Sequence, residues 1–291
     1  MKKFFTSIVI LLFAATSFSQ SGFSDLMKRN ERELAKKLKE LRSVRKNKDL
    51  KEKNEAFIKG LKIVLGEEET FNYPFDSLNS ISKITSPDNS FRLFNWNVEM
   101  QDGSQKFYCF ILKKDGEIIE LNDKHQFMNN PETKKLTDKN WYGAVYYEII
   151  PIGRKQYTLL GWNGKSSLTT QKLIEVMSLG NKKAKFGASV FKFEDTRDRR
   201  RRFILEYAND AYVSMKYVKQ RKSKQIVYDH VSPSTPQTEG FYQFYYPDLS
   251  YDSFTLEGGK WVHQPLVEPK NNKSDADKLY NDPKAKSPFN R

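Results

Sequence analysis

The feature of this sequence with the clearest chemical meaning is a concentration of basic side chains in its second half. Residues 182–224 contain 14 Lys and Arg against 5 Asp and Glu. Arginine guanidinium groups match the oxygen geometry of phosphates and carboxylates, and they keep their charge at any accessible pH. The side chains that we expect to bind an anionic partner are Arg197, Arg199, Arg200, Arg201, Arg202, Lys216, Lys219, Arg221, Lys222 and Lys224.

These ten residues lie before or at the start of one predicted strand, 202–207, and near or after the end of the next, 211–218. In an antiparallel meander the start of the first strand and the end of the second lie at the same end of the hairpin, so we expect the ten cations to converge. Three interpretations compete: a solvated rim that protects a sheet edge, a site for lipid phosphates or an acidic protein partner, and a nucleic-acid surface. The N-terminus predicts export, and export disfavours nucleic acid as the partner.

Other reactive residue types are sparse. The histidines His125, His230 and His263 have no spacing typical of a metal site, and Cys109 lies in an apolar run where a buried thiol is expected. A single cysteine excludes internal disulfides and Cys-based zinc or iron–sulfur sites. We predict no catalytic residue, metal or cofactor. The sequence leaves open a hydrolase, because the fold can bring two distant carboxylates together as a catalytic pair.

Two segments resemble ligand-binding loops without meeting their requirements. Residues 161–167 read Gly-Trp-Asn-Gly-Lys-Ser-Ser, but a phosphate-binding loop would need glycine at the position of Leu159. We interpret Asn163-Gly164 as a turn, followed by a helix capped by Ser167 or Thr169. The carboxylates of 194–198 lack the spacing of a calcium loop and lie among arginines, so we expect them to pair internally.

The N-terminus has the layout of a secretory signal peptide. Lys2 and Lys3 precede an apolar run at 8–15, and the small residues Ser17 and Ser19, at positions −3 and −1, allow cleavage after Ser19. The apolar run is too short to span a bilayer, and no later segment is long and apolar enough to do so. We therefore expect an exported bacterial protein, periplasmic or extracellular, that loses the signal peptide 1–19 and has no transmembrane segment when mature.

Residues 20–68 are predicted to form a charged helical segment. Leu34, Leu38 and Leu41 repeat with the period of a helix, and a second apolar series runs over 50–65. Polar residues at 47–49 interrupt the pattern, and Asp49 is expected to cap the second helix. This predicts a helix hairpin or one broken helix, which docks on the following domain or binds a partner.

Residues 69–267 are predicted to form an antiparallel β-rich domain, and 268–291 a mobile polar tail. Asp102-Gly103 and Asp115-Gly116 are hairpin turns between strands 91–100, 105–113 and 117–121. One inserted helix is expected at 169–179. Further strands are expected at 144–150, 156–162, 188–193, 202–207, 211–218, 225–230, 241–246, 253–257 and 260–263, the last two joined at Gly258-Gly259. The predicted fold class is α+β: an N-terminal helix pair followed by a mainly antiparallel β body, a sandwich or a meander-type sheet.

Two segments carry a resemblance to known sequences. The stretch Tyr157-Thr158-Leu159-Leu160-Gly161-Trp162-Asn163-Gly164 and the later Tyr246-Pro247-Asp248-Leu249-Ser250-Tyr251-Asp252 are similar to exported proteins of a bacterial family with no known activity. The resemblance covers roughly residues 90–265. It implies export and a β-rich body, and it implies no site residue.

The charge distribution leads to the functional hypothesis. Residues 25–65 carry a net charge of +7 and residues 182–224 carry +9, whereas the rest of the expected mature chain sums to −4. We expect a non-enzymatic cell-envelope protein that binds or scaffolds through these basic patches, with an envelope protein or an anionic envelope surface as partner. The alternative is a hydrolase of a cell-wall or surface polymer. The aromatic run 241–246 is expected to be a core strand or a carbohydrate or peptide platform.

Overall fold

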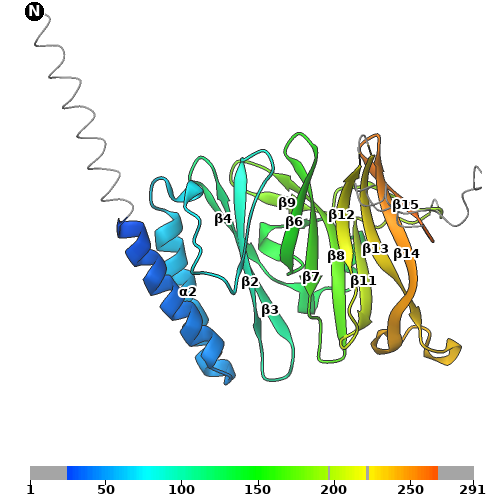
Figure 1. Ribbon diagram of the computed structural model, residues 1–291, viewed down its shortest axis with the longest axis horizontal. Helices are drawn as coiled ribbons and strands as arrows, with labels where there is room; N and C mark the ends of the chain where they lie inside the picture. Colours follow the sequence, from blue (N-terminus) through cyan, green and yellow to red (C-terminus); the bar gives the residue numbers. More distant parts are fainter. Residues whose placement is uncertain (1–24, 196, 221–222, 268–291) are drawn as a thin grey trace, which may run out of the picture.

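The computed structural model describes residues 25–195, 197–220 and 223–267. Within these residues a pair of helices and three β-sheets stack as four layers along the longest axis of the molecule (Figure 1). The predicted fold class, α+β with two N-terminal helices and a mostly antiparallel β body, is confirmed. The predicted signal peptide 1–19 and the predicted tail 268–291 lie outside the described residues.

The first layer is a helix hairpin. Residues 25–43 are helical, and α2 spans Asn47–Leu65. Lys53 Nζ lies 3.1 Å from Glu40 Oε2, and a Cβ placed on Gly60 would lie 3.1 Å from Leu34 Cδ2. Because later residues of α2 meet earlier residues of the first helix, the two helices run antiparallel.

The apolar stripe of the hairpin docks on the first sheet. Leu34, Leu38 and Leu41 are buried in one core with residues of that sheet, so the helical period was predicted correctly. The predicted cap was wrong: α2 begins after Lys46, and Asp49 lies within the first turn. In the part of the chain that the structure describes, no helix combines the length and apolar character needed to cross a membrane.

The second layer is a four-stranded antiparallel meander in the order β1-β2-β3-β4. Asp102-Gly103 and Asp115-Gly116 make its tight turns, with both glycines at positive φ, as their sequence predicted. Its strands are β1 (Ser82–Thr85), β2 (Phe91–Glu99), β3 (Gln105–Lys113) and β4 (Ile118–Asn122).

The third layer is a sheet in the order β5-β9-β8-β7-β6, with β11 also paired to β8. On that side of β8 two strands lie end to end, because Met177 pairs with Phe186 of β9 and Glu175 pairs with Arg202 of β11. The strands are β5 (Leu136–Thr137), β6 (Val145–Gly153), β7 (Gln156–Asn163), β8 (Thr169–Leu179), β9 (Ala184–Phe186) and β11 (Arg202–Ala208).

The predicted inserted helix at 169–179 is wrong, because these residues form β8. Its apolar side chains alternate between two cores: Leu173 and Met177 face the second layer, whereas Ile174 and Val176 face the fourth. A central strand buried on both faces has apolar residues at consecutive positions, and such a run does not show the period of two that identifies half-buried strands.

The fourth layer is a sheet in the order β10-β15-β14-β13-β12, in which β10 pairs parallel to β15. Gly258-Gly259 forms the predicted tight turn. The predicted strand 241–246 is largely a 3-10 turn at Tyr242–Phe244 instead, and its rings face solvent where the chain reverses. The strands are β10 (Phe191–Lys192), β12 (Met215–Gln220), β13 (Ser223–Pro233), β14 (Tyr245–Glu257) and β15 (Lys260–Gln264).

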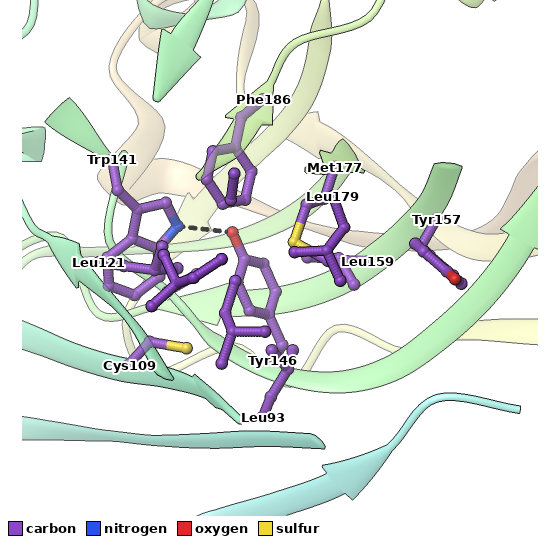
Figure 2. Close-up of a cluster of buried hydrophobic side chains, with 14 of the residues drawn as sticks. Leu93, Cys109, Leu121, Trp141, Tyr146, Tyr157, Leu159, Met177, Leu179 and Phe186 are labelled. Carbon is purple, nitrogen blue, oxygen red and sulfur yellow. Dashed lines mark hydrogen bonds between the residues drawn. The ribbon is translucent and has the colours of Figure 1, made fainter. Parts of the chain in front are cut away.

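Apolar cores fill the spaces between successive layers. Figure 2 shows the core between the second and third layers, where Trp141 Nε1 donates a hydrogen bond of 2.7 Å to Tyr146 Oη. Cys109 lies in this core with 1% of its surface exposed, and burial raises the pKa of its thiol far above the ordinary value. The prediction of a buried cysteine is confirmed.

Candidate functional site

The predicted arginine cluster is largely engaged in internal contacts. Arg197 Nε lies 3.1 Å from Asp195 Oδ1, and Arg200 Nε donates a 2.7 Å hydrogen bond to Asp198 Oδ2. The expected internal pairing of these carboxylates is therefore observed. The guanidinium of Arg200 also stacks 3.8 Å above the ring centre of Phe193.

Two of the predicted binding arginines anchor a loop. Arg202 is fully buried and paired with Glu175, and its Nη1 donates to the backbone oxygens of Pro131 and Lys134. The backbone N–H of Arg201 donates a 2.6 Å bond to Glu132 O. The side chain of Arg202 is therefore not available to a partner, and we assign it a structural role.

The arginine and lysine runs are not joined by the expected hairpin. Arg200 packs on Phe193, whose ring contacts Phe254 of β14 and His263 of β15. Lys216 and Lys219 lie on β12, an edge strand of the fourth layer. β11 and β12 belong to different sheets, so the hairpin assumed for the convergence does not exist.

The lysines along β12 and β13 differ in exposure. Lys216 and Lys219 are exposed on the edge strand β12, and Lys224 Nζ lies 3.5 Å from Pro151 O. Arg221 and Lys222 lie outside the described residues, and Arg199 is exposed beside Asp198. A surface for an anionic partner therefore depends on the exposed members of this set.

The side-chain pair that most resembles part of a catalytic site is Asp123 and His125. The sequence did not single out this pair. His125 Nδ1 lies 2.8 Å from Asp123 Oδ1. A carboxylate next to one ring nitrogen of histidine fixes the proton there and leaves the lone pair on the other nitrogen. The sequence signal was an Asp-x-His triplet directly after a predicted strand, and it is visible in residues 123–125.

The backbone around Asp123 holds this carboxylate in place. Oδ1 accepts a 3.0 Å hydrogen bond from the N–H of His125, and Oδ2 accepts one of 3.0 Å from the N–H of Phe107. Asp123 also forms an isolated bridge to Trp141. Gly143, at φ +30°, permits the close approach, because a Cβ there would overlap the carboxylate.

The His125 ring is buried between two aromatic rings. Its centre lies 5.3 Å from that of Phe107 and 6.1 Å from that of Tyr142, both edge-on. The residue is 8% exposed, and among the described residues its Nε2 has no hydrogen-bond partner. A buried nitrogen without a partner destabilises the fold by about 1–3 kcal/mol, so a ligand that donates a hydrogen bond to this atom would offset that cost.

Two cavities border His125. One, of about 490 Å³, lies toward β11 and the loop at 131–132, and the other, of about 570 Å³, lies toward β3 and β4. His125 and Gln126 line both. The residues around the 490 Å³ cavity are mostly polar or aromatic: Ser104, His125, Gln126, Met128, Pro131, Glu132, Tyr142, Lys165, Gln171, Ile204, Glu206 and Tyr242.

A hydrogen-bonded chain crosses the wall of the 490 Å³ cavity. Tyr142 Oη donates to Gln171 Oε1 at 2.9 Å, and Gln171 Nε2 donates to Glu206 Oε2 at 2.7 Å. Lys165 Nζ donates to the same carboxylate at 2.8 Å. Burial raises the pKa of Tyr142 far above its ordinary value, so its hydroxyl stays a neutral donor. These contacts hold the wall rigid while Glu206 keeps further lone pairs for a ligand.

The other two histidines meet at Asp252 in the fourth layer. His230 Nδ1 lies 2.9 Å from Asp252 Oδ2, and the N–H of Leu266 donates to Oδ1 at 3.0 Å. His263 Nε2 lies 3.0 Å from Tyr228 Oη and 3.9 Å from the Asp252 carboxylate. This network ties β13, β14 and β15 together. Among the described residues, no group of three or more His, Cys, Asp or Glu side chains is placed to hold a metal ion.

Comparison of the chain with protein-family models, with curated proteins and with solved structures found no match. The resemblance to a family of exported bacterial proteins therefore stays a prediction.

Proposed function

We propose that this is an exported cell-envelope protein that binds a hydroxyl-rich ligand, a sugar unit of an envelope polysaccharide, in the 490 Å³ cavity beside His125. The observation that carries the proposal is the buried Nε2 of His125, which has no partner in the described chain and belongs to a residue that lines the cavity. The proposal keeps the binding role expected from the sequence and places it in a pocket.

The protonation of the pair indicates what the ligand must offer. With the proton of the neutral ring on Nδ1, facing Asp123, Nε2 is an acceptor and needs a donor such as a hydroxyl group. A ligand hydroxyl bonded to Nε2 would remove the penalty of the unsatisfied nitrogen.

The rest of the cavity fits the same ligand class. Glu132, Glu206 and Gln171 supply oxygen acceptors for further hydroxyls, and Lys165 supplies a donor. Tyr242, which is 44% exposed, supplies aromatic surface on which the C–H face of a sugar ring can pack. The cavity is lined by two acidic side chains, Glu132 and Glu206, and one lysine, Lys165. This excess of negative charge disfavours an anionic ligand.

The test is calorimetric titration with neutral oligosaccharides, namely oligomers of β-1,4-linked N-acetylglucosamine, β-1,4-linked glucose and β-1,3-linked glucose. We expect at least one of them to bind. His125→Phe, which keeps a ring but removes the acceptor, should weaken that binding about tenfold or more. Lys216→Gln, on the distant edge strand β12, is the matched control. If no oligosaccharide binds the folded protein, or if His125→Phe binds as tightly as the wild type, the proposal is wrong.

Hydrolysis of the same polymer is a second candidate, because His125 and Glu132 line one cavity and a carboxylate orients the histidine. In this scheme His125 Nε2 accepts a proton from the attacking water, and Glu132 donates one to the leaving oxygen. Release of reducing ends from the bound polymer, lost in Glu132→Gln while binding persists, would support an enzyme. If the polymer binds and no reducing ends are released, the protein has the binding function and is not a hydrolase of that polymer.

A further inference from the structure

A group of large apolar side chains is exposed next to the proposed binding cavity. Tyr212 is 85% exposed and Leu249 is 91% exposed, and the rings between 241 and 246 are exposed by roughly half. We call this set the aromatic tip, and its members are Tyr212, Phe241, Tyr242, Phe244, Tyr246 and Leu249.

The segment that carries most of the tip is fixed by its own hydrogen bonds. Ser234 N–H donates to Phe244 O at 2.9 Å, and Gly240 N–H donates to Tyr245 Oη at 3.0 Å. The rings of Tyr242 and Tyr245 lie 5.0 Å apart. A platform held in one conformation loses little entropy when a ligand binds.

The aromatic tip is continuous with the 490 Å³ cavity. Tyr242 belongs to both, because it lines the cavity and is 44% exposed. Tyr246 Oη donates to Asp210 Oδ1 at 3.2 Å, which holds the tip against the end of β11 beside Tyr212. In Figure 1 this segment is the loop that joins β13 to β14.

The local charge restricts what can lie on the tip. The protein has 50 Lys and Arg, but none lies between residues 231 and 248, the stretch that carries most of the tip, whereas that stretch contains Glu239 and Asp248. Nucleic acids, anionic lipids and acidic polymers bind through phosphate or carboxylate contacts to cations. An uncharged partner with apolar ring faces suits this surface.

We infer that the ligand is an extended neutral polysaccharide, with one sugar unit in the cavity and successive units packed on the aromatic tip. The inference rests on the proposed function, because it extends the same site. Stacking of sugar rings on exposed aromatic side chains buries apolar surface from both partners. Affinity should therefore rise with the length of the oligosaccharide beyond what fits the cavity.

The test compares the disaccharide and the hexasaccharide of each of the three polymers above, by calorimetry. For the polymer that binds, we expect the hexasaccharide to bind the wild type about tenfold more tightly than the disaccharide. Phe241→Ser combined with Phe244→Ser should remove this gain and leave the disaccharide affinity unchanged. Ile63→Ser, which removes an exposed apolar side chain from α2, is the control.

The outcomes separate the two proposals. Equal affinity for short and long oligosaccharides in the wild type, or a gain that the double variant keeps, overturns the inference and leaves the binding function intact. Absence of all binding overturns the proposed function itself. A concentration-dependent dimer that the double variant abolishes, measured by sedimentation, would show that the tip contacts a second copy of the chain, and would overturn the polysaccharide inference.

Discussion

Glu175 of β8 and Arg202 of β11 form a wholly buried ion pair, in which Arg202 Nε donates a 2.6 Å hydrogen bond to Glu175 Oε1. Tyr146 Oη donates to the other oxygen of this carboxylate at 2.8 Å. Through Nη1 the same arginine holds the loop at 131–134, which borders the 490 Å³ cavity. The pair therefore connects the centre of the third layer to the wall of the proposed site.

Removing one member of this pair should be strongly destabilising. Arg202→Met leaves the Glu175 carboxylate buried without its partner, and we expect the free energy of unfolding to fall by about 3–5 kcal/mol. Glu175→Gln combined with Arg202→Met removes the stranded charge and should lose clearly less than Arg202→Met alone. Urea denaturation followed by circular dichroism measures both, with Lys216→Ala as the exposed control, expected within about 0.5 kcal/mol of the wild type. Similar losses for Arg202→Met and Lys216→Ala would contradict the assigned role.

Gly143 should be required for the geometry of the Asp123–His125 pair. A Cβ at this position would lie 2.7 Å from Asp123 Cγ and 2.8 Å from Phe107 Cδ2. Gly143→Ala should therefore move the carboxylate, lower the thermal midpoint and weaken oligosaccharide binding.

A matched control for Gly143→Ala is Gly116→Ala. Gly116 also has positive φ, but no neighbouring atom lies within 4 Å of its added Cβ. The unfavourable backbone conformation alone destabilises by about 1–2 kcal/mol, so the additional loss in Gly143→Ala reports the contacts of the added Cβ with Asp123 and Phe107. Equal midpoints for the two variants would exclude a special role for Gly143.

Asp252 should make the fold sensitive to acid. Burial acts to raise its pKa, but the nearby ring of His263 and hydrogen bonds from His230 and the N–H of Leu266 outweigh burial and lower it to about 2. A depressed folded-state pKa gives stability that is present above the unfolded value near 3.9 and is lost as the pH falls from about 5 to 2. The contribution is about 2 kcal/mol.

Asp252→Asn should therefore reduce the loss of stability between pH 5 and pH 2, measured as the denaturation midpoint at each pH. Glu239→Gln, which changes an exposed carboxylate, is the control. Between pH 5 and pH 2, the acid limb of the stability profile, this variant should lose as much stability as the wild type. An acid limb that is as steep in Asp252→Asn as in the wild type would refute the assignment.

We still predict, separately, that the protein binds an anionic envelope surface. This prediction now depends only on Lys and Arg side chains that are exposed. Lys216→Glu combined with Lys219→Glu should weaken co-sedimentation with vesicles that contain phosphatidylglycerol, by about 30-fold or more at low salt, because each of the two lysines near such a surface contributes about 1 kcal/mol. The difference should shrink at high salt. Lys113→Gln, at a largely buried lysine paired with Asp115, is the control. Unchanged sedimentation of the double variant would end the hypothesis.

The parts of the fold that were predictable depend on local chemistry. Asp102-Gly103 and Asp115-Gly116 specify tight turns by the backbone freedom of glycine, and Leu34, Leu38 and Leu41 specify a helix face by their spacing. β8 was not predictable in this way. Its two faces are both covered, so the alternation that distinguishes a strand from a helix is absent.

The candidate site was harder to predict than the fold, because it is assembled from distant segments. The burial of His125 depends on Phe107 and Tyr142, which come from separate strands and loops. The exclusion of Arg202 from the surface depends on Glu175, 27 residues earlier in the chain. Net charge locates basic segments in a sequence, but it does not tell which guanidinium groups are satisfied internally.

Apart from β10, which precedes β11 in the chain but belongs to the fourth layer, the layers stack in chain order, and this has a consequence for how the molecule forms. The second and third layers each keep an apolar face uncovered until the segment that forms the next layer has been made. Folding from the N-terminus onward would therefore leave one apolar face at a time exposed to solvent at the growing end. The fourth layer covers the last of these apolar faces. A chain shortened before β12 would leave Ile174 and Val176 exposed to water, where they could contact other copies of the chain.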